Sequence, residues 1–512
     1  MTTNLTALFY VLSISGLAYL YLSKAIKPIT NPKDFNIWIS AWTVLTSVAF
    51  LATDLLQFFA VSAVLIFYFY KRIENKFYLY LILLFVVPGY IYKLPIITLN
   101  FQVLIGLFLL LPIFIALTFR PNSSDHFKKS FADIFLVSYL TLVFFLDFRG
   151  VFVRPGEGIQ LTYISCIKNG INIFLQFYLP YFVASRYLKN FEQIKHAAIA
   201  FVAICLIISP IAISEVVLSD LLYLNLPNTL NVDWSLKEAV IRSNLVRATA
   251  SIEHPLYLGT TMLIAVMLYL FVSRYIKNKL LALIGGLILI GGLLAPLSRG
   301  PWTGALLATC CYMMLGKQKV RKFAWGLSIA SITVLMVSLT GHLDDLISFL
   351  PFVGNVDEGN IDYRAQLIDT SLILVEESPF FGTYNPEYHK AMQSLVQGEG
   401  IVDIVNLYLG VLLNYGFVGL FLYVGFFTTV TLSLFKALSL IKDKSSPEFT
   451  LGKSLLAILI GLFLVMTVIA NSGFFNTLLF ILVGLSVSYV RTIKNAFIPE
   501  EEKYPTTKVK VA

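Results

Sequence analysis

The chain is dominated by apolar runs about as long as a lipid bilayer is thick. Runs of roughly 20 apolar residues recur along it, which is the length that a helix needs to cross a membrane. A water-soluble core has no place for so many of them. Only 13% of the 512 residues are charged, against about 25% in a soluble domain. The sequence therefore predicts an all-α polytopic membrane protein with about 14–15 transmembrane helices.

Polar stretches divide these runs into regions. We expect N-terminal transmembrane helices (1–216), an outer loop with an arginine motif (217–255), transmembrane helices with a Ser-Arg-Gly motif (256–340), a large extracytoplasmic cap (341–402), C-terminal transmembrane helices (403–492) and a cytoplasmic tail (493–512).

The cap is the longest polar segment, yet apolar and aromatic residues persist through it, so we expect it to be folded and partly helical. The pattern from Asp362 to Glu377 predicts an amphipathic helix that Asp362 caps and Pro379 ends. Arg364 would then lie in the first turn, where the helix dipole disfavours a cation and a bound anion would offset that cost. Beyond the cap, Asn414–Gly416 is predicted to separate a short entry helix from a longer span.

Lysine-rich clusters indicate the orientation. Clusters such as 71–76, 274–279 and 436–453 all fall on one side of the predicted spans. Positive charge beside spans marks the cytoplasmic side. We therefore expect a cytoplasmic C-terminus and an extracytoplasmic cap. The net charge of +9 is explained by this topology, and we expect no nucleic-acid partner.

Arginine departs from the lysine pattern. Six of the twelve arginines fall in the predicted outer loops: Arg149, Arg154, Arg242, Arg247, Arg299 and Arg364. The rigid fork of an arginine suits bidentate binding of phosphate or carboxylate. Arg299 stands between Pro296 and Pro301 at the start of a span, where amide groups of the helix start would face an anion. Pairing with outer acids such as Glu253, or with lipid headgroups, is the alternative.

The order of these motifs resembles the bacterial O-antigen ligase and polymerase superfamily, which includes exopolysaccharide repeat-unit polymerases. The resemblance covers about 247–419 in motif and the whole chain in architecture. It rests on the following motifs in order: Arg247 with His254-Pro255, Ser298-Arg299-Gly300, Arg364, Pro379-Phe-Phe-Gly382, Asn406-Leu-Tyr-Leu409 and Tyr415-Gly416-Phe-Val-Gly419.

The resemblance implies a bacterial enzyme of the cytoplasmic membrane. Members of the superfamily use a glycan carried on a polyprenyl diphosphate, outside that membrane. An acceptor hydroxyl attacks the anomeric carbon and the lipid diphosphate leaves. Members are regarded as metal-independent, so no cofactor is expected, and the four cysteines show no metal-ligand spacing. The implied partners are the lipid-linked glycan, the bilayer and, for many polymerases, a chain-length regulator or other polysaccharide assembly protein.

The resemblance and the residue chemistry together suggest a site. Arg247 and Arg299 would stabilise the leaving diphosphate, and Arg364 would close over it from the cap. Candidates for the base that activates the acceptor are Glu253, His389 and Asp403. Substrate-binding candidates are the remaining polar residues of the outer loops and motifs: Arg154, Arg242, His254, Ser298, Asn406 and Tyr408.

Two positions depart from the ligases. Val405 stands where a histidine usually precedes the asparagine of the last motif, and Tyr384 replaces the second glycine expected after Gly382. We therefore favour a polymerase of lipid-linked repeat units over a ligase that transfers the glycan to another acceptor. A polysaccharide transporter or flippase is the alternative from another class, although no internal repeat is legible. A non-catalytic assembly partner also stays open.

Overall fold

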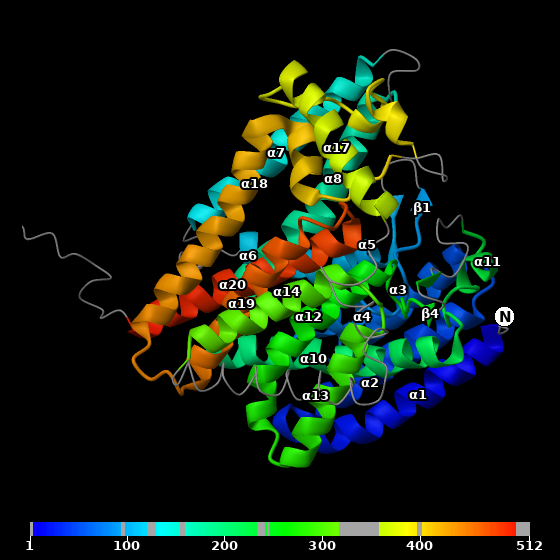
Figure 1. The fold of residues 1–512 in the computed structure, drawn as a ribbon. Helices are drawn as coiled ribbons and strands as arrows, with labels where there is room; N and C mark the ends of the chain where they lie inside the picture. The colour runs from blue at the N-terminus through cyan, green and yellow to red at the C-terminus, as the bar shows by residue number, and fades with distance from the viewer. Residues whose placement is uncertain are drawn as a thin grey trace, which may run out of the picture.

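The computed structural model shows a bundle of helices (Figure 1) and describes residues 4–93, 98–119, 130–153, 159–232, 241–242, 245–316, 358–396 and 402–497. Within these residues, nine helices are long and apolar enough to cross a membrane, and two shorter apolar helices accompany them. The expected all-helical, polytopic membrane architecture is thus confirmed. The end of the predicted transmembrane region 256–340, from 317 on, lies outside the described residues.

The helices of the first half are α1 (Asn4–Ala25), α2 (Pro32–Leu51), α3 (Leu55–Tyr70), α4 (Lys76–Leu83), α5 (Phe101–Ile105), α6 (Leu111–Phe119), α7 (Phe131–Asp147), α8 (Tyr163–Ile173), α9 (Leu179–Tyr187), α10 (Phe191–Leu218) and α11 (Leu226–Thr229). Two π-helical turns, η2 (Gly106–Leu110) and η5 (Phe174–Tyr178), join α5 to α6 and α8 to α9.

The helices of the second half are α12 (Pro255–Val272), α13 (Lys279–Leu294), α14 (Arg299–Met314), α17 (Glu358–Glu377), α18 (Leu407–Leu440), α19 (Pro447–Val465) and α20 (Gly473–Phe497). Two short antiparallel ladders pair β1 (Tyr92–Lys93) with β2 (Thr98–Leu99), and β3 (Ile241–Arg242) with β4 (Leu245–Val246). Short 3₁₀ turns are η1 (Lys27–Ile29), η4 (Phe148–Val151), η6 (Ser273–Tyr275), η7 (Pro386–Tyr388) and η8 (Met392–Leu395).

Helix α12 lies inside the bundle and packs against α10, α13, α14 and α19. Glycines allow close packing around it. A Cβ atom at Gly259 of α12 would lie 2.9 Å from the Pro301 ring of α14, and one at Gly461 of α19 would lie 2.6 Å from the Gly304 carbonyl oxygen of α14. Small residues let helix backbones approach in this way. The packing brings the start of α14 beside the start of α12.

Helix α4 is short, because it ends at Leu83 and irregular backbone follows. That backbone is buried among other helices. The carbonyl oxygen of Phe85 accepts hydrogen bonds from Trp42 Nε1 (3.0 Å) and Ser251 Oγ (2.8 Å). Irregular backbone at membrane depth is tolerated where protein groups satisfy it in this way.

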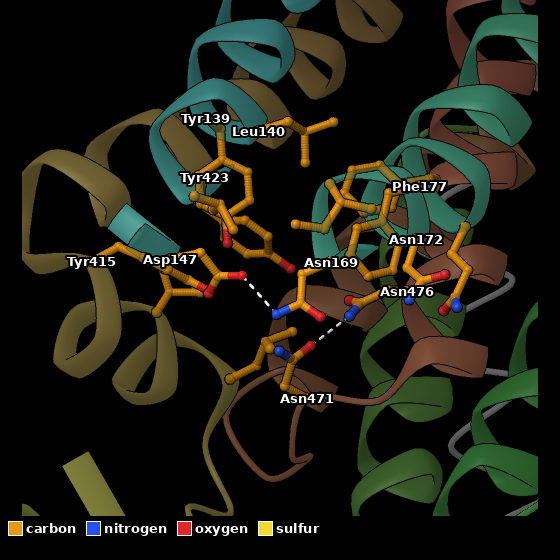
Figure 2. A pocket seen from close by; sticks show the side chains of 16 residues that line it. Tyr139, Leu140, Asp147, Asn169, Asn172, Phe177, Tyr415, Tyr423, Asn471 and Asn476 are labelled. Carbon is orange, nitrogen blue, oxygen red and sulfur yellow. Dashed lines mark hydrogen bonds between the residues drawn. The ribbon is translucent and has the colours of Figure 1, made fainter. Parts of the chain in front are cut away.

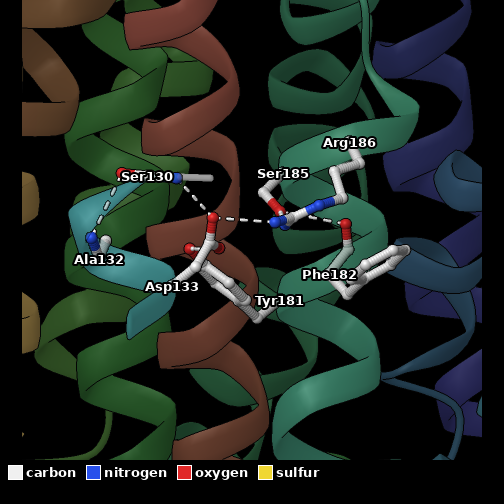
Figure 3. A network of polar contacts seen from close by, with 7 residues as sticks. All are labelled: Ser130, Ala132, Asp133, Tyr181, Phe182, Ser185 and Arg186. Carbon is white, nitrogen blue, oxygen red and sulfur yellow. Dashed lines mark hydrogen bonds and ion pairs between the residues drawn. The ribbon is translucent and has the colours of Figure 1, made fainter. Parts of the chain in front are cut away.

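A buried polar network fastens α7 to α9 (Figure 3). Asp133 closes a capping box with Ser130 at the start of α7. Its carboxylate also pairs with Arg186 at 2.9 Å and accepts a hydrogen bond from Tyr181 at 2.8 Å. Arg186 donates a further hydrogen bond to Ser185 at 2.7 Å. A buried ion pair is tolerated when other hydrogen bonds satisfy it, so this network fixes the relative position of the two helices.

The described part of the cap, residues 358–396, docks on the start of α18. Helix α17 lies at the top of Figure 1, over one end of the bundle. Its buried residues Leu367 and Leu374 pack with Met392, Leu395 and Leu413, the last of which belongs to α18. The predicted amphipathic helix of the cap is therefore present.

Two details of that prediction are wrong. Helix α17 begins at Glu358, so Asp362 lies within the helix and does not cap it, and Arg364 lies beyond the first turn. Carboxylates are favourable throughout the first turns of a helix, and Asp362 therefore gave no sharp signal of the helix start.

The predicted break near Asn414–Gly416 is also present, as a kink inside α18. Gly416 has φ 64° and ψ −168°, a conformation that is essentially restricted to glycine. Gly382 of the cap has φ 68°. A Cβ atom at Gly416 would overlap the backbone of Phe380, and one at Gly382 would lie 2.7 Å from the backbone of Asn414. The backbone of the turn at Gly382 therefore contacts the backbone of the kink at Gly416. We call this contact the Gly382–Gly416 interlock.

Arg149, in the 3₁₀ turn η4 directly after α7, joins these two segments. Its guanidinium donates hydrogen bonds to the carbonyl oxygens of Phe381 (2.9 Å), Gly382 (2.7 Å) and Asn414 (2.7 Å). Three backbone bonds join the same segments, from Thr383 N–H to Leu413 O, from Phe417 N–H to Pro379 O and from Val418 N–H to Phe380 O. The cap is thus positioned by hydrogen bonds to the backbone.

We predict that Gly416→Ala destabilises the docking of the cap. The new side chain would meet the backbone of the cap in a conformation that costs alanine about 1–3 kcal/mol. The matched control is Gly410→Ala in the same helix, where a Cβ atom meets only Ile404 at 3.8 Å. Thermal unfolding of the purified protein in detergent should show a lower Tm for the first variant only. Equal Tm values for the two variants would contradict the interlock.

Candidate active site

The turn between α13 and α14 is held by Arg247. Its Nε donates to the carbonyl oxygen of Pro296 (3.1 Å), and one of its terminal nitrogens donates to Ser298 Oγ (2.8 Å). Ser298 is buried and itself donates to Pro296 O (3.2 Å). Because Arg299 follows directly as the first residue of α14, Arg247 fixes the place where that helix begins.

Arg242 holds the same turn from another side. Its guanidinium donates to the carbonyl oxygen of Leu297 at 2.6 Å. Leu297 has φ 49°, which is uncommon for a residue with a side chain. Burial lowers the pKa of Arg242, and the positive charges of Arg299 and Arg364 lower it further. These two arginines therefore lie close enough to Arg242 to repel it, although α17 supplies one of them from the cap.

The cluster of Arg242, Arg247, Arg299 and Arg364, which we call the arginine cluster, concentrates positive charge. Burial lowers the pKa of Arg247 to about 10, and the charge of Arg242 adds to that effect. Both groups stay protonated at neutral pH. Among the described residues, no carboxylate contributes to the pKa of either one. A bound anion would relieve this repulsion, and the amide groups at the start of α14 would add donors to it.

His254 caps α12. Its Nδ1 accepts a hydrogen bond from the Leu256 N–H at 3.1 Å. Burial lowers the pKa of His254 to about 4, and the charge of Arg247 contributes. The ring is therefore neutral at neutral pH, and the nitrogen that could take a proton is already bonded. This geometry favours a structural role over proton transfer.

Glu253 has the properties of a base. Burial raises the pKa of its carboxyl group to about 7, while hydrogen bonds from Ser472 and the Gly89 backbone oppose that shift. The bond from Ser472 Oγ to Glu253 Oε2 measures 3.3 Å. A general base works best when its pKa lies near the working pH. Glu253 also directly precedes His254, on whose pKa the charge of Arg247 acts, while its own carboxyl group contacts Ser472 and Gly89.

The two other base candidates lie in different places. The backbone of Asp403 forms hydrogen bonds with the Tyr363 hydroxyl (2.9 Å each), and the charges of Asp403 and Glu253 both act on the hydroxyl of Tyr257. Asp403 and Glu253 thus both lie near Tyr257, in the first turn of α12.

His389 lies at the other end of the cap. Its Nε2 is 3.2 Å from a carboxylate oxygen of Glu377 at the end of α17. Along a helix axis, Glu377 and Arg364 are roughly 20 Å apart. The fold therefore does not bring His389 to the arginine cluster through α17.

The remaining substrate-binding candidates use their polar groups within the protein or lie elsewhere. Asn406 caps α18 by accepting from the Leu409 N–H (3.1 Å), and the Tyr408 hydroxyl donates to the Phe463 carbonyl (3.2 Å). Arg154 lies outside the described residues. Arg149 does not share the anion-binding chemistry expected of the outer arginines, because three carbonyl groups occupy its donors.

A cavity that the sequence analysis missed lies between α7, α8, α18 and α20 (Figure 2). Its volume is about 280 Å³. Its lining is rich in side-chain amides, which come from Asn169, Asn172, Gln176, Asn471 and Asn476. Amides within apolar spans are costly unless they face a partner or a cavity. Amide side chains within predicted spans were therefore the sequence signal for this cavity. They come from separate segments, however, and only the fold shows that these segments lie side by side.

Together these features define a class of protein: a polytopic membrane protein with a cationic site at the start of α14 and a buried carboxyl group of raised pKa at the start of α12. Residues 284–424 match the model of the Wzy_C family, described as O-antigen ligase. The chain therefore carries an O-antigen ligase family domain. The matched stretch includes Arg299, Arg364 and the Gly382–Gly416 interlock, whereas Arg247, Glu253 and His254 precede it. A search of curated proteins found no match to the chain.

The family assignment agrees with the site geometry. Enzymes of this family transfer lipid-linked glycans in a membrane setting and serve polysaccharide biosynthesis. A lipid-linked glycan is thus the substrate class that the family implies for this chain.

We predict that His254→Asn keeps both stability and activity, whereas His254→Ala lowers stability by about 1 kcal/mol. Asparagine is a good N-cap residue and retains an acceptor for the Leu256 N–H, while alanine does not. Thermal unfolding and glycan transfer by the purified variants check this. A folded but inactive His254→Asn protein would mean that the imidazole takes part in the chemistry.

Proposed function

We propose that this protein is a membrane glycosyltransferase that polymerises polyprenyl-diphosphate-linked oligosaccharide repeat units on the outer face of the bacterial cytoplasmic membrane. The observation that carries the proposal is the arginine cluster at the start of α14, together with the buried carboxyl group of Glu253, which follows Arg247 on the segment that leads into α12. This arrangement offers donors for a diphosphate and a base for a hydroxyl group, which are the two needs of the reaction.

The proposed step balances as follows. Glu253 takes the proton of an acceptor hydroxyl as its oxygen attacks the anomeric carbon of the donor glycan. The bond between that carbon and the diphosphate oxygen breaks, and its electron pair leaves with the lipid diphosphate. Arg247 and Arg299 stabilise the charge that develops on the leaving group, and Arg364 contributes from the cap. The proton on Glu253 then passes to solvent or to the released diphosphate.

The placement of charge supports an extracytoplasmic site. Arg274 ends the α12 segment and Lys279 begins α13, so the turn between these helices is basic. Glu253 precedes α12 and Arg299 follows α13, so each helix separates the basic turn from the site. Basic turns mark the cytoplasmic side. The site and the cap then face outward, and the C-terminus is cytoplasmic.

A ligase is the second candidate, because the matching family model is described as O-antigen ligase. A ligase would use the same donor and leaving group and would differ in its acceptor. Val405, which stands where ligases usually have a histidine, is our reason for favouring a polymerase. A polymerase of this kind would also be expected to work with a chain-length regulator.

We predict that Arg247→Ala and Arg299→Ala each lower kcat by about 100-fold or more, since each removes a preorganised donor to the leaving group. The measurement is turnover of a native polyprenyl-diphosphate repeat unit by purified protein, with EDTA present and glycan length as the readout. The control is Arg72→Ala, which removes an exposed arginine that stacks on Tyr68.

The products separate the alternatives. A ladder of longer glycans from the wild type identifies a polymerase, and transfer that requires a second acceptor identifies a ligase. Movement of the intact lipid across a liposome bilayer without any transfer would identify a transporter. Full turnover by both arginine variants would contradict the proposed role of the cluster.

We predict that kcat/KM rises with pH through a midpoint near 7. Glu253 accepts a proton only when its carboxyl group is ionised, and its pKa is raised to about 7. Activity is therefore lost as pH falls below that value. Glu253→Gln should abolish transfer at every pH while the protein stays folded. Retained activity in this variant would move the role of base to another group, with Asp403 as the next candidate.

A further inference from the structure

We propose that the amide-lined cavity between α7, α8, α18 and α20 binds an uncharged sugar unit of the acceptor glycan. This inference rests on the proposed function and assigns a second part of the substrate to a place beside the reacting groups. Four observations carry it: the chemistry of the lining, its unpartnered polar atoms, its charge, and its position relative to Glu253.

The lining matches the hydrogen-bonding needs of a sugar. An amide side chain carries both donors and acceptors, and a hydroxyl group does likewise. Gln176 lines the cavity from η5. Asn169 and Asn172 face it from α8, Asn471 from the segment before α20, and Asn476 from the first turn of α20 (Figure 2). Apolar contact is available from Phe177 and Phe480, whose ring centroids lie 5.4 Å apart.

Two polar atoms of the lining are not satisfied by the protein. Asn172 Oδ1 and the Tyr423 hydroxyl are buried and have no hydrogen-bond partner among the described residues. Tyr423 is only 3% exposed. Buried polar groups almost always have a partner. A sugar hydroxyl in the cavity would supply one to each of these atoms.

Charge restricts which ligand fits. Asp147 is the only charged residue of the described lining, and it accepts a hydrogen bond from Asn169 at 2.8 Å. A carboxylate repels phosphate groups and acidic sugars. The cavity is therefore suited to an uncharged sugar and not to the diphosphate. Its volume of about 280 Å³ lies just below the range of about 300–1,000 Å³ for sites of drug-sized ligands, so a small part of a glycan would occupy it.

The position of the cavity links it to the proposed reaction. Asn471 lines the cavity, and the next residue, Ser472, donates to the Glu253 carboxylate. On the other side, a Cβ atom at Gly473 would lie 2.7 Å from the side-chain oxygen of Gln176. The wall of the cavity is thus one residue away from the group that binds the proposed base. A sugar held there would present a hydroxyl toward Glu253.

The test compares binding of two probes to the purified protein in nanodiscs by calorimetry. One probe is the free oligosaccharide of the native repeat unit, without lipid or diphosphate. The other is undecaprenyl diphosphate, without sugar. The variants are Tyr423→Phe and Asn172→Leu, which each remove an unpartnered polar atom and so break no hydrogen bond in the protein.

The matched control is Tyr223→Phe. Tyr223 is also 3% exposed, and its hydroxyl is also unpartnered among the described residues, but it does not line the cavity. We expect Tyr423→Phe and Asn172→Leu each to raise the Kd of the oligosaccharide about fivefold or more and to leave that of undecaprenyl diphosphate unchanged. The control should change neither. Arg299→Ala should weaken only the diphosphate probe.

The inference is overturned if the wild type does not bind the oligosaccharide, if both cavity variants bind it within twofold of the wild type, or if Tyr223→Phe weakens it equally. These outcomes are distinct from failure of the proposed function. That failure would show as absent turnover and unchanged diphosphate binding in Arg299→Ala. Selective loss of oligosaccharide affinity would then still establish the sugar site.

Discussion

Repulsion among four arginines is the constraint on which the proposed active site depends. Arg242 and Arg247 donate hydrogen bonds to backbone carbonyl groups of the turn before α14, and these bonds set the position of Arg299. Burial lowers the pKa of both residues, and the positive charges of their neighbours in the cluster lower it further. A site that stores repulsion in this way is preorganised for an anion, since the donors need not move when charge develops on a leaving diphosphate.

The rest of the fold holds the two sides of this site together. The tight packing of α12 against α14 brings the start of α12, which Glu253 and His254 precede, beside the turn before α14. Arg242 and Arg247 donate hydrogen bonds to that turn. On the cap side, Arg149 joins the turn at Gly382 to the kink at Gly416. That interlock fixes α17 on α18, and α17 carries Arg364 toward Arg242. The helices thus serve as a frame that places charges from distant parts of the chain.

The membrane class and the main arginines of the site could be predicted from the sequence, because the patterns that indicate them lie within short stretches of the chain. Apolar runs gave the membrane class, and the sorting of arginine from lysine drew attention to Arg247 and Arg299. What could not be predicted depends on contacts between distant segments. The role of Arg149 requires three carbonyl groups from the cap and α18. The raised pKa of Glu253 requires burial of its carboxyl group among segments that are distant in the sequence, and the amide cavity gathers residues from four helices.

The most direct test of this account is a cryo-electron microscopy structure of the protein in nanodiscs with undecaprenyl diphosphate and EDTA. We predict density for the diphosphate at the start of α14, within hydrogen-bond distance of Arg247 and Arg299, with Arg364 turned toward it. Density for the diphosphate at the basic turn between α12 and α13, or anywhere away from the arginine cluster, would contradict the account.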